Sequence, residues 1–218
     1  MYKACVFDMD GTVLNTLDSI AYFGNEALKT MGFSAIPVNE YKRMIGNGAD
    51  LLIARMLEYG GNPADARSEL RREYDRLYEA EPLRLVEIYP GIDSLLRDLK
   101  ADGVLLGILS NKPDNVTKGI AEQVFPGIFD RVQGQRQEMP QKPDPTALLS
   151  MLKEFSVAAE NSLYCGDSGV DMETGKGAGL YTVGVCWGFR NRDELIKSGA
   201  DCLVHSAQEL RTAIYGQK

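Results

Sequence analysis

Residues 3–16 read KACVFDMDGTVLNT, and this stretch decides the fold. A short apolar run, residues 4–7, ends in two aspartates one residue apart, Asp8 and Asp10, which Gly11 follows. A run of this length, bounded by polar and glycine signals, predicts a buried strand that enters a tight loop. Two carboxylates this close repel each other, and a divalent cation such as Mg²⁺, which prefers oxygen ligands, would relieve the repulsion. The stretch alone also fits a plain polar loop after a core strand, so the rest of the chain must decide.

Composition and charge narrow the class of protein. The chain has 218 residues, of which 44% are hydrophobic and 25% charged, as expected for a globular protein with a sizeable core. A formal charge of −7 and the lack of any basic block argue against a nucleic-acid partner. No apolar stretch approaches the ~20 residues of a membrane span, and no leader-like segment precedes the first strand, so we expect no membrane partner.

The four cysteines lack metal-ligand spacing and lie in apolar, strand-like runs. This usage predicts small buried thiols in a reducing compartment, and therefore a cytoplasmic protein. They are Cys5, Cys165, Cys186 and Cys202.

Residues 17–81 show a helical pattern throughout. Residues 17–32 carry an apolar stripe at helical spacing, and helical patterns continue over 38–45, 51–59 and 64–81 with glycine-rich breaks between them. No strand pattern interrupts this region, which predicts a small all-α domain inserted after the first strand. We place this helical cap at residues 16–85 and the core domain at residues 1–15 and 86–218.

Beyond residue 89, strand patterns alternate with helical ones. This alternation predicts βαβ units and a parallel sheet, so the expected fold is an α/β, Rossmann-like parallel sheet with an inserted all-α cap. The expected strands after the first lie at 104–109, 129–132, 162–165, 181–186 and 202–204. The expected helices lie at 92–101, 114–123, 146–155, 170–177, 192–198 and 206–214.

Chemically capable side chains fall where these strands end. Ser110 and Asn111 follow the second strand, Asp167 follows the fourth, and Lys142 lies in the loop after the third. Ligands of parallel sheets bind outside the carboxyl ends of the strands, where these groups would meet Asp8. Each has a plain structural alternative: Ser110 and Asp167 are also typical helix caps, and Lys142 is typical of an exposed surface.

Together these residues resemble the four motifs of the haloacid dehalogenase (HAD) superfamily, which span the whole α/β domain. The segment from Asp8 to Thr12 is similar to the first motif, Ser110 to the second and Lys142 to the third; Gly166-Asp167 with Asp171 is similar to the fourth.

The resemblance implies a Mg²⁺-dependent phosphatase. In such an enzyme Asp8 is the nucleophile and Asp10 the acid/base, and Ser110 and Lys142 hold phosphoryl oxygens. The implied metal site contains Asp8, the backbone of Asp10, and Asp167, with Asp171 as a ligand or a support. Thr12 and Asn111, adjacent to these motifs, are further candidates for binding the substrate.

The cap segment Arg43-Met44-Ile45-Gly46-Asn47-Gly48 resembles that of phosphoglycolate phosphatase-like members of the superfamily. We expect its glycine loop to reach over the active site, with the helix that starts near Ala49 favouring an anion at its N-terminus. Arg43 and Gly46 are therefore candidate substrate contacts, as is Arg55, although a plain turn between helices is the alternative. Asn15 stands where many relatives have aspartate, a change that concerns hydrogen bonding in the loop rather than the chemistry.

Related activities can be weighed by residue. A dehalogenase lacks the second aspartate, and a β-phosphoglucomutase-like mutase uses a histidine just after the first motif, whereas the only histidine here is His205. A pyrophosphatase of the same superfamily stays open, and a non-catalytic phosphoacceptor domain of signalling proteins would lack the helical insert. We expect hydrolysis of a small phosphorylated metabolite, preferably phosphoglycolate-like, through an aspartyl-phosphate. The chain could be a monomer or a homodimer.

Overall fold

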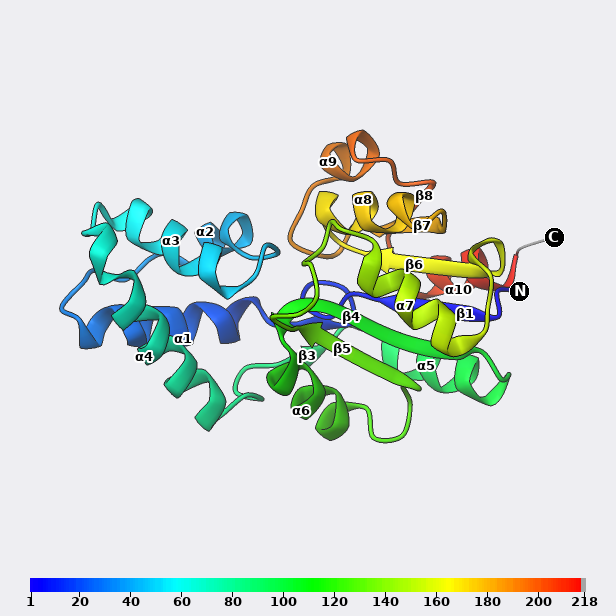
Figure 1. The fold of residues 1–218 in the computed structure, drawn as a ribbon, viewed down its shortest axis with the longest axis horizontal. Coiled ribbons are helices and arrows are strands. Elements are labelled where there is room, and N and C mark those ends of the chain that lie inside the picture. Colours follow the sequence, from blue (N-terminus) through cyan, green and yellow to red (C-terminus); the bar gives the residue numbers. More distant parts are fainter. Residues whose placement is uncertain (217–218) are drawn as a thin grey trace.

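An α/β body and a helical body lie side by side in the computed structural model, which describes residues 1–216 (Figure 1). The α/β body contains one six-stranded sheet in the order β5-β4-β1-β6-β7-β8, and every neighbouring pair is parallel. Its strands are β1 (Ala4–Phe7), β4 (Leu105–Pro113), β5 (Arg131–Gln135), β6 (Ser162–Gly166), β7 (Tyr181–Val185) and β8 (Cys202–Val204). The predicted parallel sheet is confirmed.

Helices cover both faces of this sheet. All four residues of β1 are buried, as expected for a central strand of a parallel sheet. Cys5 and Phe7 pack into a cluster with α5 (Ile92–Ala101), α6 (Asp114–Val124) and α10 (Ala207–Tyr215), whereas Ala4 and Val6 pack on the opposite face against α7 (Thr146–Phe155). On that second face α8 (Gly169–Gly177) also lies against β6, and α9 (Arg192–Lys197) packs beside α8.

The order of the strands creates a crevice at β1. From β1 the chain adds β4 and β5 on one side, and then returns to build β6, β7 and β8 on the other. Ligands of open parallel sheets bind at such a switch point, outside the carboxyl ends of the strands. The residues that follow β1, β4 and β6 are therefore brought to one place by topology alone.

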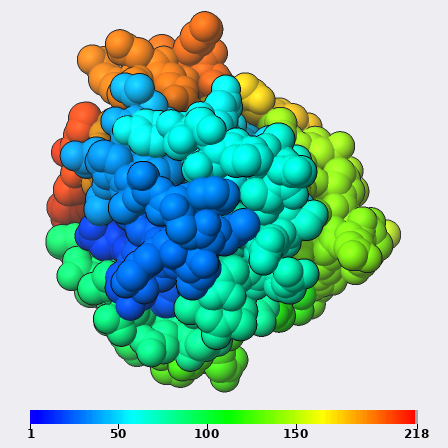
Figure 2. Space-filling model, turned by 90° about the vertical axis from the view of Figure 1, so that its left-hand side faces the viewer, coloured from blue at the N-terminus to red at the C-terminus, as the bar shows by residue number. Residues whose placement is uncertain are grey.

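The helical body consists of α1 (Leu17–Thr30), α2 (Val38–Met44), α3 (Ala49–Gly60), a 3-10 turn (Ala64–Ala66) and α4 (Arg67–Ala80). Aromatic side chains pack α1 against α4: the Phe23 and Tyr78 ring centroids are 4.9 Å apart, and those of Tyr74 and Tyr78 are 5.6 Å apart. In Figure 2 its blue and cyan atoms cover the end of the molecule that faces the viewer, below the orange segment around α9. The predicted helical cap inserted after the first strand is confirmed.

A small antiparallel ribbon joins the two bodies. It pairs β2 (Leu14–Asn15) with β3 (Glu87–Ile88), so that Leu14 faces Ile88. The sequence analysis missed both strands, because two residues are too few to show a strand period. The ribbon lies next to the domain boundaries that we predict at 15/16 and 85/86.

Two element boundaries differ from the sequence prediction for identifiable reasons. Strand β5 begins at Arg131, because Phe129, which suggested an earlier start, instead packs its ring against Phe125. Strand β4 continues with an irregularity as far as Pro113, so Ser110 and Asn111 belong to the strand rather than to a loop after it.

The cysteine prediction is only half right. Cys5 and Cys165 are fully buried, but Cys186 and Cys202 near the sheet edge are partly exposed. Within the described part of the chain, no helix combines the length and the apolar character needed to cross a bilayer.

Candidate active site

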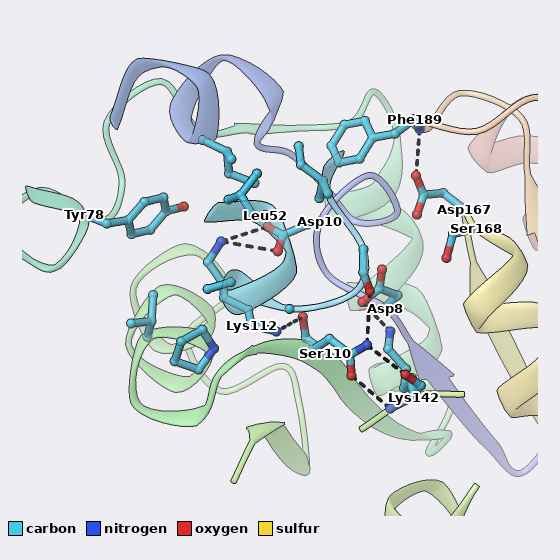
Figure 3. Close-up of a pocket in the computed structure, with 18 of the residues that line it drawn as sticks. Asp8, Asp10, Leu52, Tyr78, Ser110, Lys112, Lys142, Asp167, Ser168 and Phe189 are labelled. Carbon is cyan, nitrogen blue, oxygen red and sulfur yellow. Dashed lines mark hydrogen bonds and ion pairs between the residues drawn. The ribbon is translucent and has the colours of Figure 1, made fainter. Parts of the chain in front are cut away.

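A cavity of about 70 Å³ lies between the carboxyl edge of the sheet and the helical body. The α/β body contributes the aspartates and lysines that Figure 3 shows around it, and the helical body contributes apolar and aromatic side chains such as Leu52 and Tyr78. The site is therefore polar on the floor and largely apolar on the side that faces the cap.

Asp8 follows β1 at the floor of the cavity and is paired with Lys142. The Lys142 Nζ lies 2.8 Å from Asp8 Oδ1 and 2.7 Å from Asp171 Oδ1, and it also donates to the carbonyl oxygen of Leu109 at 3.1 Å. The Lys142 side chain is only 4% exposed. Its ammonium is thus fixed between two carboxylates.

Burial and charge shift the protonation of this pair in a defined direction. Burial raises the pKa of Asp8 to about 7; the Asp171 charge adds to the rise and the Lys142 ammonium opposes it. Burial alone would lower the pKa of Lys142, but Asp171 and Asp8 hold it well above its ordinary value. Lys142 therefore stays cationic, whereas Asp8 needs a further cation to be fully ionised at neutral pH.

Asp171 supports Lys142, since hydrogen bonds already occupy both of its carboxylate oxygens. Oδ1 accepts from Lys142 Nζ and from the Tyr164 hydroxyl at 3.1 Å, and Oδ2 accepts from the backbone N–H of Ser168 at 3.1 Å and from its hydroxyl at 2.6 Å. Ser168 and Asp171 form the capping box that begins α8. A carboxylate offers about four lone-pair sites, and here donors take all of them.

Asp167 follows β6 and points towards Asp8 with fewer partners of its own (Figure 3). Its Oδ2 accepts from the backbone N–H of Phe189 at 2.7 Å. Burial raises the pKa of Asp167 well above its ordinary value, and the charges of Asp171 and Asp8 raise it further. The approach is close: a Cβ built on Gly11, which has φ +88°, would overlap the Asp167 carboxylate. Glycine at position 11 thus makes room for Asp167.

The acidic cluster fits a divalent cation. Carboxylate oxygens of Asp8, Asp167 and Asp171 lie within 4.8 Å of one another, and all three residues are buried. Within residues 1–216, Lys142 is the only cation in salt-bridge contact with these three carboxylates, so negative charge remains uncompensated. An all-oxygen donor set of this kind suits Mg²⁺. Since Asp171 is occupied, Asp8 and Asp167 are the side chains best placed to hold it.

The Asp10 carboxylate has separate partners. It accepts from the Thr16 hydroxyl at 2.8 Å and from Lys112 Nζ, which lies 3.1 and 3.3 Å from its two oxygens. The Lys112 ammonium also lies 4.5 Å from the ring centroid of Tyr78 on α4. Asp8 and Asp10 therefore occupy different surroundings, although one residue separates them in the chain.

Ser110 and Asn111 both line the cavity, but their side chains differ in availability. The Ser110 hydroxyl oxygen accepts from the backbone N–H of Lys112 at 3.2 Å, which leaves its own proton free to donate. The Asn111 amide accepts from the Lys142 backbone N–H at 3.0 Å and donates to the Lys142 and Gly46 carbonyls, each at 3.1 Å. Asn111 thus braces the Lys142 loop and the cap loop.

The structure does not bring three of the predicted contacts to the cavity. Arg43 is exposed on α2 because it lies on the outer face of that helix, and it does not line the cavity. Thr12 is buried beneath the site, and its hydroxyl has no hydrogen-bond partner among residues 1–216. Arg55 braces the cap loop from within by donating to the Met44 carbonyl at 2.8 Å and to the Asn47 side chain at 3.0 Å. Gly46 does line the cavity.

The sequence analysis missed several residues at the site, among them Thr16, Tyr78, Lys112 and Arg190. Arg190 reaches from the loop after β7 to the cap, where it donates to the Ile45 carbonyl at 2.6 Å. Lys112 directly follows the candidate pair Ser110-Asn111, and this position in the sequence could have indicated that Lys112 belongs to the site. Tyr74 and Tyr78 are spaced like any core stripe of a helix, so their pattern did not separate site from core.

Comparison with known proteins identifies the family. The family model described as "Haloacid dehalogenase-like hydrolase" matches residues 5–185, which is most of the chain and includes every motif residue above. The chain belongs to the haloacid dehalogenase-like hydrolase family. The resemblance drawn from the motifs is thereby confirmed.

Its relatives include several phosphatases. The chain is 31% identical over 205 residues to a phosphoglycolate phosphatase of Vibrio cholerae, covering 91% of each protein. It is 33% identical over 208 residues to a phosphoglycolate phosphatase of Rhodospirillum rubrum, covering 92% of this chain and 86% of that one. A crystal structure of a predicted phosphoglycolate phosphatase from Haemophilus somnus superposes with a TM-score of 0.91 at 25% identity, over 97% of both chains. These relatives confirm the expected enzyme class, a phosphoric monoester hydrolase.

Proposed function

We propose that this hydrolase cleaves a small phosphomonoester through a phosphoryl group carried on Asp8, with Mg²⁺ as its cofactor. The observation that supports this most directly is the separation of the two aspartates: Asp8 lies in the acidic cluster with Lys142, whereas Asp10 lies outside it with Lys112 and Thr16. One carboxylate is thus placed for nucleophilic attack and the other for proton transfer.

In the first step an oxygen of Asp8 attacks phosphorus in line with the ester oxygen. The Asp8 Oδ–P bond forms while the P–O ester bond breaks, and Asp10 gives its proton to the leaving oxygen. Lys142 and the Ser110 hydroxyl face the equatorial phosphoryl oxygens, where stabilising charge lowers the barrier to phosphoryl transfer. The alcohol then leaves with its hydroxyl group protonated.

In the second step Asp10, now a carboxylate, takes a proton from a water molecule. The oxygen of that water attacks phosphorus, and the bond between phosphorus and Asp8 breaks. Inorganic phosphate is released and Asp8 returns to its carboxylate form. Asp10 has then recovered the proton that it gave up, so the enzyme is ready for another cycle.

Asp8 and Asp167 would hold the Mg²⁺ with the backbone carbonyl of Asp10, while Asp171 keeps Lys142 in place. When bound, the cation supplies positive charge to the phosphoryl oxygens and relieves the repulsion between the buried carboxylates. The uncompensated acidic cluster supports this assignment.

The cavity supports a small substrate. A volume of about 70 Å³ beneath the cap suits a short ester. The relatives from Vibrio cholerae and Rhodospirillum rubrum are named phosphoglycolate phosphatases, and phosphoglycolate is therefore the substrate that we favour. We place the enzyme in the cytoplasm, as a monomer or a homodimer.

A mutase of the same superfamily is less well supported. His205 lies at an exposed position after β8 and does not line the cavity. The site therefore lacks the histidine that such a mutase uses near its first motif.

The test is phosphate release from a panel of phosphomonoesters and pyrophosphate, with kcat/KM measured for each. We expect short carboxylate-bearing esters to lead the panel, EDTA to stop turnover and Mg²⁺ to restore it. Absence of hydrolysis for every ester would overturn the proposed reaction, and full activity in EDTA would overturn the metal assignment.

A further inference from the structure

Lys112 is a buried cation that the proposed reaction does not use. Its side chain is 8% exposed, and it lines the cavity beside Asp10. Burial alone would lower the pKa of Lys112, but the Asp10 carboxylate, together with Tyr78, holds it above its ordinary value. The two contacts with Asp10 use at most two of its three N–H groups, so at least one can serve another acceptor.

The cap places a second polar group next to this ammonium. Tyr78 on α4 is 3% exposed, and its hydroxyl, which lies close to Lys112, makes no well-formed hydrogen bond within residues 1–216. Its ring lies over Lys112, and Figure 3 shows the hydroxyl directed into the cavity towards Asp10 and Lys112. A buried hydroxyl without a partner costs free energy unless a bound group satisfies it.

The position of this pair relative to the reacting atoms is informative. In the proposed reaction the ester oxygen must lie against Asp10, and Lys112 Nζ lies 3.1 Å from an oxygen of Asp10. A group attached one carbon beyond the ester oxygen therefore comes within reach of Lys112. On its other side that group would meet the Tyr78 hydroxyl.

We propose that Lys112 and the Tyr78 hydroxyl form a subsite for a carboxylate on the leaving portion of the substrate, one carbon from the ester oxygen. This proposal rests on the proposed function and deepens it, because it names the residues that select a short phosphorylated carboxylic acid. The subsite is shared between the two bodies: the cation comes from β4, and the hydroxyl comes from the cap.

The neighbouring charges are compatible with an anion at this place. Asp75 lines the same cavity, where Arg71 pairs with it through contacts of 2.7 and 2.9 Å while also pairing with Asp50 at 2.7 Å. Glu79 also lines the cavity, but at an exposed position, where water screens it. Arg190, also in the cavity lining, adds a second positive charge on the sheet side.

Two esters separate recognition from a merely structural role. Phosphoglycolate carries the carboxylate, and ethyl phosphate has the same chain length without it. If Lys112 binds the carboxylate, Lys112→Met lowers kcat/KM for phosphoglycolate roughly 10- to 100-fold more than for ethyl phosphate. Lys112→Arg keeps the charge and retains most of the preference. Lys118→Met, on the exposed side of α6, is the matched control and leaves the preference unchanged.

Tyr78→Phe tests the cap half of the subsite without changing charge or volume much. We expect a several-fold rise in KM for phosphoglycolate and little change for ethyl phosphate. It also keeps the test open if Lys112→Met does not fold.

The outcomes are distinguishable. An equal loss for both esters in Lys112→Met would show that Lys112 only positions Asp10, and would overturn the subsite. If KM for phosphoglycolate is unchanged in Tyr78→Phe, the proposed role of the Tyr78 hydroxyl is overturned. If the wild-type enzyme cleaves neither ester, the proposed function itself fails and the subsite falls with it; a wild-type enzyme that cleaves both with equal efficiency overturns the subsite alone.

Discussion

Two aspartate–lysine pairs lie side by side at the carboxyl edge of the sheet, and they differ in what holds them. Asp8 and Lys142 belong to the α/β body, where Asp171, Tyr164 and the Leu109 carbonyl fix the ammonium. Asp10 and Lys112 lie beneath the cap, and the neighbour that covers Lys112 is Tyr78 of α4. The first pair is thus preassembled by the sheet, whereas the second is completed by the helical body. In the proposed reaction, attack on phosphorus would take place at the edge of the sheet, and selection of the leaving group at the boundary between the bodies.

The largest expected effect separates the two aspartates. Asp8→Asn removes the nucleophile and should lower kcat by about 10⁴-fold or more, whereas Asp10→Asn removes a proton carrier and should cost about 10²- to 10⁴-fold. Circular dichroism should show both variants folded. Steady-state kcat with the best ester checks the order, and an Asp8→Asn enzyme near wild-type activity would contradict it.

The two lysines should differ in stability. Lys142→Met leaves Asp8 and Asp171 buried without their shared counter-charge and should lower the free energy of unfolding by about 3–5 kcal/mol. Lys112→Met should cost less, about 1–3 kcal/mol, because Asp10 keeps its bond to Thr16 and borders the cavity. Urea unfolding of the metal-free proteins measures the free energy of unfolding of both variants. The control Lys118→Met should stay within about 0.5 kcal/mol of wild type. An equal loss at the two lysines would remove the distinction between the pairs.

The acidic cluster should make metal-free stability depend on pH. Because burial raises the pKa of Asp8 to about 7 and that of Asp167 also upward, the folded protein holds protons that the unfolded chain releases near pH 4. The free energy of unfolding therefore falls as the pH rises from about 4 to about 7. Added Mg²⁺ should raise the melting temperature more at pH 8 than at pH 5.

Asp167→Asn provides the control for this pH dependence. It removes one of the repelling carboxylates, so its metal-free melting temperature should fall less than that of the wild type between pH 5 and pH 8. Each kcal/mol corresponds to about 2–4 °C in a chain of this size. A wild-type melting temperature that rises over this range in EDTA, with no difference from Asp167→Asn, would contradict the account.

The smallest effect concerns the bond between the two bodies. Arg190→Ala removes the donation to the Ile45 carbonyl and should raise KM roughly 2- to 10-fold, with a smaller change in kcat. Arg97→Ala, which removes an exposed ion pair on α5, is the control. An unchanged KM in Arg190→Ala would show that this bond does not stabilise the arrangement that binds substrate.

The sheet and the floor of the site could be predicted from the sequence because their signals are local. Asp8 and Asp167 end short buried runs, and the topology of a parallel sheet brings such ends together. Lys142 was also predicted, through the resemblance of its loop to the third motif. The four hydrogen-bond partners of its ammonium, by contrast, follow only from the folded structure.

The Asp10–Lys112–Tyr78 arrangement could not be predicted in the same way. Lys112 meets Asp10 across 102 residues of chain, and Tyr78 belongs to an aromatic stripe that any core helix could carry. The prediction for Arg43 failed in the other direction. Its position in a motif-like segment suggested a substrate contact, but the turn of α2 directs its side chain to solvent. Contacts between the two bodies depend on how the cap packs, which residue patterns within either body do not encode.

The division of work between Asp8 and Asp10 is tested most directly by trapping the phosphorylated enzyme. Asp10→Asn should still accept the phosphoryl group from a reactive ester, but should release it slowly for lack of a base. Acid quenching followed by peptide mass spectrometry should then find one phosphoryl group on the peptide that contains Asp8, and none in Asp8→Asn. Turnover without any phosphorylated peptide, or a phosphoryl group on another residue, would contradict the assignment.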